Sequence, residues 1–151
     1  MSNITISKMT SDDISQIYEI EKDSFPIPWE KETFEHELSN LLATYLVAKI
    51  DNKVVGFIGA WFVMDECQIT NIAVHKDYRK EEIGSQLVAE LLKECKHHGT
   101  TYVMLEVRTN NIPAQKLYTK FGFTEEVIRK EYYKNPDGTR DDAIVMSKEL
   151  K

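Results

Sequence analysis

The spacing of apolar residues changes several times along the chain, and each change predicts a new element of secondary structure. Polar and apolar residues alternate over 3–8, which predicts a short strand. The run 10–13 is a helix start with acidic residues where the helix dipole favours them, and helical spacing then continues to Ser24. Two prolines exclude a helix interior from 25–29. A second short helix is predicted over 31–40, with these residues facing inward: Phe34, Leu38 and Leu41.

The rest of the chain alternates between strands and two further helices. Apolar residues recur at helical spacing from Ile83 to Cys95, which predicts a long amphipathic helix that Gly99 ends. Asn111 is the predicted cap of another helix, which has a proline in its first turn and ends near Phe121. Strands are predicted at 45–50, 54–62, 66–74, 101–107, 124–133 and 142–148. Helices interrupt the strands, so the predicted class is α/β or α+β with a mixed central sheet.

Length and composition narrow the protein class. The 151 residues fit one domain spanning 1–151. The apolar runs are shorter than the roughly 18 residues of a membrane span, and the N-terminus lacks a basic segment followed by an apolar one, so we expect a cytoplasmic protein. Cys67 and Cys95 form neither a disulfide framework nor a metal-ligand pattern, and we predict two buried thiols in a reducing compartment. The net charge of −6 argues against general nucleic-acid binding.

The charge is distributed unevenly along the chain. Residues 1–70 carry 12 acidic and 5 basic side chains, whereas residues 71–151 carry 13 acidic and 14 basic ones. Two interpretations of the acidic first half remain open. The acids either cover solvated helix faces or form a surface that attracts a cationic ligand.

Two segments carry candidate chemistry. Over 71–85 a strand runs into a polar loop and then into the long helix, so free backbone N–H groups and the positive end of the dipole can face an anion such as pyrophosphate. Many such junctions bind nothing. Glu106 lies near the end of a strand, and Tyr118 lies on the helix that follows. They are either a general base and acid across a cleft or a solvated Glu and a Tyr at the core edge.

Several segments in a fixed order together resemble the GNAT N-acetyltransferases, and the resemblance covers nearly the whole chain. Within that family, the chain is similar to a subgroup that acetylates the N-terminal alanine of a small-subunit ribosomal protein. The segments that carry the resemblance are Phe25–Trp29, Asn71–Val74 with Tyr78 and Arg79, Leu105–Arg108, Asn111, Leu117–Tyr118, Phe121–Phe123, Tyr132–Tyr133 and Asp142–Met146.

The resemblance implies a single-domain GNAT fold, with a mixed, mostly antiparallel sheet of about seven strands and about four flanking helices. It also implies acetyl-CoA as donor, a protein α-amine as acceptor, Glu106 as general base, Tyr118 as general acid and no metal. The implied cofactor contacts are Ile72, Ala73, Val74, Arg79, Lys80, Glu81, Glu82, Ile83, Gly84, Ser85 and Asn111. The candidate acceptor contacts are Trp29, Tyr132 and Tyr133, whose aromatic rings can pack a peptide and whose polar tips can bond it. Trp29 and the tyrosines can equally form a local hydrophobic cluster.

One residue departs from the family pattern in the pyrophosphate loop. Residues 79–84 read Arg-Lys-Glu-Glu-Ile-Gly, so that Glu82 stands where the family has glycine. A glutamate adds negative charge near a diphosphate and restricts the backbone angles that glycine permits. We predict weakened acetyl-CoA binding, and hence that Glu82→Gly tightens it; a glutamate that points to solvent beside Lys80 would instead cost little, and the third alternative is lost binding.

Two further functions remain as alternatives. The first is a GNAT enzyme that acetylates a small amine or a lysine side chain, and the second is a non-catalytic CoA-binding module. A lysine amine has a pKa of about 10.4, against about 7.7–8.0 for an α-amine, so a lysine acceptor demands a stronger base. We expect a monomer or weak dimer that binds a protein N-terminus, with no direct contact to nucleic acid or a membrane.

Overall fold

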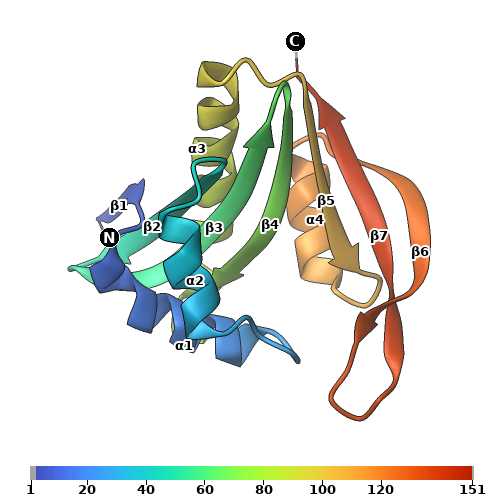
Figure 1. Cartoon of the computed structure of the whole chain (residues 1–151), viewed down its shortest axis with the longest axis horizontal. Helices are drawn as coiled ribbons and strands as arrows, with labels where there is room; N and C mark the ends of the chain where they lie inside the picture. The colour runs from blue at the N-terminus through green and yellow to red at the C-terminus, as the bar shows by residue number, and fades with distance from the viewer. Residues whose placement is uncertain (1–2, 151) are drawn as a thin grey trace.

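The computed structural model describes residues 3–150 and contains one mixed sheet with helices on both faces (Figure 1). Across these residues there are seven strands, and their order in the sheet is β1-β2-β3-β4-β5-β7-β6. The strands are β1 (Ile4–Lys8), β2 (Ala43–Ile50), β3 (Lys53–Val63), β4 (Glu66–Val74), β5 (Tyr102–Arg108), β6 (Thr124–Lys134) and β7 (Arg140–Glu149). The four α-helices of the same region are α1 (Ile14–Ser24), α2 (Lys31–Leu38), α3 (Ile83–His97) and α4 (Ile112–Lys120). The predicted α/β class with a mixed, mostly antiparallel sheet is confirmed.

Two apolar clusters hold the helices on opposite faces of the sheet. Ile14, Ile17 and Ile20 of α1 and Phe34 of α2 pack with β2 and β3 on one face. The inward residues of α3, with Tyr118 of α4, pack in the larger cluster on the other face. Strand alternation sends side chains to both faces, and β3 is buried along most of its length because it has a helix layer on each side.

The parallel strands β4 and β5 lie at the centre of the sheet and separate towards their C-terminal ends (Figure 1). They pair over Glu66–Ile69 and Tyr102–Leu105. Thr70 is an extra residue opposite β3, because Asn71 pairs with Gly59 and Ile69 with Ala60. Such a bulge bends its strand and increases its twist. The separation leaves the ends of the two strands open to a ligand between them.

The predicted elements are present, with one error in the side-chain orientation. The second helix ends at Leu38 rather than at residue 40, and of its three predicted inward residues Phe34 is buried while Leu38 and Leu41 are 41% and 100% exposed. Leu38 is the last residue of the helix, and Leu41 lies beyond it in a turn in which the Asn40 side chain accepts a hydrogen bond from the Leu42 N–H at 3.0 Å. Cys67 and Cys95 are buried free thiols, as predicted.

Two negative findings apply to the described chain. None of the helices within residues 3–150 has the length and apolar character needed to cross a membrane. In that same range, no three or more His, Cys, Asp or Glu side chains come together as a potential metal site.

Candidate active site

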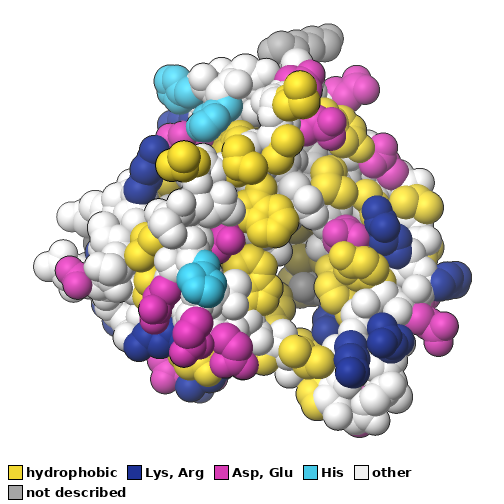
Figure 2. All heavy atoms as spheres, in the orientation of Figure 1, with side chains coloured by type: hydrophobic (Ala, Val, Ile, Leu, Met, Phe, Trp, Pro, Cys, Tyr) yellow, Lys and Arg dark blue, Asp and Glu magenta, His cyan; other side chains and the backbone are white. Residues whose placement is uncertain are grey.

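Two clefts adjoin where β4 and β5 separate. The first, here called the central cleft, has a volume of about 510 Å³ and lies between the 25–29 loop, the ends of β4 and β5, and Tyr133 and Asp141 of the β6–β7 hairpin. The second, here called the helix cleft, has a volume of about 560 Å³ and lies between the start of α3 and α4. The clefts share the wall residues Ser24, Phe25, Ile72, Asn111 and Ala114. Figure 2 shows a hollow with hydrophobic side chains on its walls between the α1–α2 side and the hairpin.

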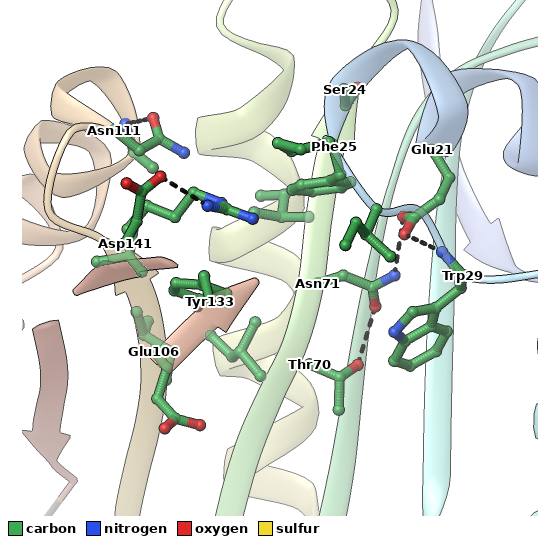
Figure 3. Close-up of a pocket in the computed structure, with 18 of the residues that line it drawn as sticks. Glu21, Ser24, Phe25, Trp29, Thr70, Asn71, Glu106, Asn111, Tyr133 and Asp141 are labelled. Atoms are coloured by element: carbon green, nitrogen blue, oxygen red, sulfur yellow. Dashed lines mark hydrogen bonds and ion pairs between the residues drawn. The ribbon is translucent and has the colours of Figure 1, made fainter. Parts of the chain in front are cut away.

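Glu106 lies on the β5 side of the central cleft (Figure 3). Alternation along β5 buries Leu105 and Val107 and turns Glu106 to the opposite face. Its side chain is only 12% exposed and both carboxylate oxygens have partners on β6. Arg129 Nε lies 3.0 Å from Oε2, and the Tyr132 hydroxyl donates to Oε1 at 3.1 Å. The carboxylate is therefore held in one orientation, while further lone pairs remain for a substrate or water.

Tyr118 lies in the wall of the same cleft, on α4. Its side chain is 3% exposed and packs edge-on against Phe123, with ring centroids 5.5 Å apart. Burial raises the pKa of the Tyr118 hydroxyl above the ordinary tyrosine value. The hydroxyl consequently carries its proton throughout the neutral pH range.

The hairpin contributes two tyrosines in different ways. Tyr133 lines the central cleft, where burial raises the pKa of its hydroxyl. The Arg108 guanidinium lies 4.5 Å from the Tyr133 ring centre and donates to Asp141 Oδ2 at 2.9 Å. Tyr132 is not among the residues that line either cleft, and it reaches the site through its bond to Glu106.

A second carboxylate, Glu21, lies on the opposite side of the central cleft from Glu106 (Figure 3). It is 2% exposed, and burial raises the pKa of its carboxyl group, although two hydrogen bonds oppose that effect. Its Oε2 accepts from the Trp29 backbone N–H at 2.9 Å, and its Oε1 accepts from Asn71 Nδ2 at 3.3 Å. Glu21 thereby fixes the 25–29 loop to the end of β4. Trp29, a predicted acceptor contact, lies in the cleft wall next to this anchor.

The helix cleft brings together much of the predicted cofactor loop. Arg79, Lys80, Glu82, Gly84 and Ser85 line it, as do the β4 residues Ile72, Ala73 and Val74. Gly84 packs closely against α4, because a Cβ at this position would lie 3.3 Å from Leu117 Cδ2. Asn111 lines both clefts and also caps α4, since its side chain accepts from the Ala114 N–H at 3.2 Å.

Two residues of the predicted loop are placed differently. The Ile83 side chain is 1% exposed and belongs to the core, so only its backbone can meet a ligand. Glu81 lines neither cleft. Both residues lie at or just before the start of α3, where buried and exposed side chains follow one another within a few residues.

One alternative from the sequence was that the Glu82 side chain points to solvent beside Lys80; in the structure its ion-pair partner is Lys120. Its Oε2 accepts from Lys120 Nζ at 3.0 Å, across the helix cleft. Sequence reasoning missed Lys120, together with Glu21 and Arg129. The basic residue at the end of α4 was visible, but nothing in its spacing indicated a partner 38 residues away.

Acetyl-CoA fits the basic and glycine-containing helix cleft. Arg79, Lys80, Lys116 and Lys120 line it, and the first backbone N–H groups of the 15-residue helix α3 lie beside them. Cations and free N–H groups at a helix N-terminus are suited to a diphosphate. The β4 residues 72–74 continue the wall from this end to the central cleft, so a long, narrow ligand can reach Glu106 and Tyr118.

Comparisons with known proteins agree with this geometry. The sequence model of the acetyltransferase (GNAT) family matches residues 14–123. A Bacillus subtilis (strain 168) protein named "Putative [ribosomal protein bS18]-alanine N-acetyltransferase" is 43% identical over 142 residues, which is 93% of this chain and 92% of that protein. The [ribosomal protein bS18]-alanine N-acetyltransferase of Escherichia coli (strain K12) is 34% identical over 143 residues, 95% of each chain.

Solved structures give the same result. The crystal structure of the ribosomal-protein-S18-alanine N-acetyltransferase from Escherichia coli superposes with a TM-score of 0.90 at 33% identity, covering 99% of this chain and 95% of that one. The Arabidopsis thaliana NAA60 structure in complex with acetyl-CoA shares the fold, with a TM-score of 0.89 at 21% identity and coverage of 98% and 99%.

Proposed function

Because this chain belongs to the acetyltransferase (GNAT) family and is an acetyl-CoA-dependent N-acetyltransferase, we propose that its acceptor is the N-terminal α-amine of ribosomal protein bS18. The observation that carries this proposal is the central cleft, which has Glu106 and Tyr118 in its wall and adjoins the basic helix cleft. The names of the two curated relatives, similar over more than nine-tenths of the chain, support the choice of acceptor.

The acceptor amine must be neutral before it can attack. An α-amine has a pKa of about 7.7–8.0, so about a tenth of it is already neutral at pH 7. In the proposed reaction, Glu106 takes the remaining proton, directly or through a water molecule. Arg129 and the Tyr132 hydroxyl hold the carboxylate towards β6 and leave lone pairs for this transfer.

The cofactor supplies an activated acetyl thioester when bound. With acetyl-CoA bound, the amine nitrogen would bond to the acetyl carbon and lose its second proton to solvent, the carbon–sulfur bond would break, and the sulfur would leave with the bonding electrons. Tyr118 then gives its proton to the leaving sulfur, a role for which its buried, protonated hydroxyl is suited. Asn111 and Ile72, which line both clefts, are proposed to hold the cofactor at the junction.

The acceptor groove is proposed to use the aromatic and acidic walls of the central cleft. Trp29 and Tyr133 offer faces and polar tips to the first residues of a peptide, and Tyr132 acts through Glu106. Glu21, Glu106 and Asp141 give the cleft three carboxylates against one cation, Arg108, which pairs with Asp141. This charge favours an acceptor whose N-terminal segment is basic.

The first test measures thiol release from acetyl-CoA with a peptide that begins Ala-Arg. We expect release with the free α-amine and none when that amine is blocked while a lysine side chain stays free. Glu106→Gln and Tyr118→Phe should each lower kcat about 10²-fold or more, with acetyl-CoA affinity unchanged. Glu126→Gln, on the outer face of the hairpin and bonded to Tyr102, is the matched control and should keep wild-type turnover. Full turnover in both active-site variants would contradict the assigned roles, and release with the blocked peptide would favour a lysine acceptor.

A further inference from the structure

Lys120 and Glu82 form an ion pair across the mouth of the helix cleft. Lys120 is the last residue of α4, and Glu82 is the residue before α3 begins. Lys120 Nζ lies 3.0 Å from Glu82 Oε2 and donates to Ser85 Oγ at 2.9 Å. The ammonium is therefore held over the first turn of α3, beside the backbone N–H groups that face the cleft.

Glu82 reaches this position through an unusual backbone conformation. Its φ of +62° and ψ of +20° place it in the left-handed region, where a glycine meets no steric penalty. This is also the residue at which the family pattern has glycine. The conformation required at this position is thus kept, and the glutamate adds a carboxylate at the point where the cleft is most cationic.

The pair is weak enough to exchange for another anion. The Lys120 and Glu82 side chains are 53% and 70% exposed, and exposed ion pairs contribute little to stability. A diphosphate offers more oxygen acceptors and more charge than one carboxylate, and hydrogen bonds between charged groups are the stronger kind. Ser85 can keep one ammonium proton engaged while the anion partner changes.

We propose that Lys120 is a ligand of the acetyl-CoA diphosphate and that Glu82 competes for it, so that the cofactor must displace an internal carboxylate. The inference rests on acetyl-CoA binding in the helix cleft. It also separates two functions of Lys120. If Lys120 only neutralised Glu82, its charge would be unnecessary once Glu82 is removed, whereas a phosphate ligand stays necessary in either background.

Calorimetric titration of acetyl-CoA into four proteins distinguishes these possibilities: wild type, Glu82→Gly, Lys120→Gln and the double variant. We expect Glu82→Gly to tighten binding about threefold to tenfold and Lys120→Gln to weaken it by a similar factor. The decisive comparison is Lys120→Gln in the Glu82→Gly background, where we expect a loss at least as large as in the wild type. No loss in that background would overturn the proposal, as would an unchanged or weaker affinity of Glu82→Gly.

Two controls locate the effect. Lys93→Gln removes a comparable exposed pair on α3, in which Lys93 Nζ lies 3.2 Å from Glu90 Oε1, and it should leave the affinity unchanged. The 3′-dephospho form of acetyl-CoA should show the same Lys120 dependence, and loss of that dependence would overturn the assignment to the diphosphate. Failure of the wild-type chain to bind acetyl-CoA would contradict the cofactor site itself, whereas binding that ignores Lys120 would contradict this inference alone.

Discussion

At the scale of single residues, Glu21 is a buried side chain that can ionise. The residue is 2% exposed, and desolvation raises the pKa of its carboxyl group in the folded chain above that of an ordinary glutamate. The folded state therefore binds the proton more tightly than the unfolded state does. The resulting stability is fully present below the ordinary glutamate pKa and is lost as the pH rises through the folded value.

Comparison with Glu21→Gln measures this effect, because glutamine does not titrate. We expect the unfolding free energy of the wild type, relative to that of the variant, to fall as the pH rises from about 4 towards neutrality. Urea unfolding across this range checks the sign. Glu19→Gln, on the exposed face of the same helix, is the control variant. If the unfolding free energies of Glu21→Gln and the wild type instead change with pH in parallel, burial does not raise the pKa of the Glu21 carboxyl group.

At the scale of elements, a bulge in β6 brings the side chains of Arg129 and Tyr132 into contact with the Glu106 carboxylate. Arg129 pairs with Ala143 and Tyr133 with Asp141, so that residues 130–132 lie opposite Asp142 alone. Glu131 has a φ of +50°, and its N–H donates to Asp142 Oδ1 at 2.9 Å. The bulge is thus fixed by a carboxylate on the neighbouring strand, and it directs Arg129 and Tyr132 across β7 towards β5.

Substitution of Asp142 tests the bulge without touching Glu106. Asp142→Ala removes the acceptor for the Glu131 N–H, so we expect Tyr132 and Arg129 to lose their position and kcat/KM for the peptide to fall about tenfold. Asp142→Asn keeps an acceptor oxygen and should retain most of the activity. Acetyl-CoA affinity should be the same in both. Equal activity of the Ala and Asn variants would mean that the bulge does not position the base.

The elements also show which features were predictable from sequence. Local periodicity predicted each helix and strand, because burial on one face leaves a period of 2 or 3.6 in the sequence. It failed at Leu38 and Leu41, which are exposed although both were predicted to face inward. The family motifs pointed to Glu106 and Tyr118, which line one cleft. The contact of Arg129 with Glu106 depends instead on a bulge in β6, and the contact of Lys120 with Glu82 depends on the distance between α3 and α4. Neither a bulge nor a packing distance leaves a repeating pattern in the sequence.

At the scale of the molecule, the two halves of the sheet are joined by the short parallel pairing of β4 with β5. Beyond Ile69 and Leu105 their ends diverge, and the helix cleft continues the gap between α3 and α4. A ligand in that cleft contacts β4, α3 and α4 at once. We therefore expect bound acetyl-CoA to stabilise the folded chain by connecting these elements, in addition to serving as a substrate.

Linkage gives the size of this effect. A ligand at 100 times its dissociation constant stabilises the folded state by about 2.7 kcal/mol, which corresponds to a rise in Tm of about 5–10 °C for a chain of this size. Hydrogen exchange should slow most at the start of α3 and at residues 70–74, and least at the edge strand β1, because only the former line the clefts. At one fixed ligand concentration Glu82→Gly should show a larger rise in Tm than the wild type, since it binds more tightly. Thermal scans with and without acetyl-CoA, together with the exchange map, check both points. Protection that spreads evenly to β1 would mean that the ligand stabilises the fold globally rather than by joining the walls of the cleft.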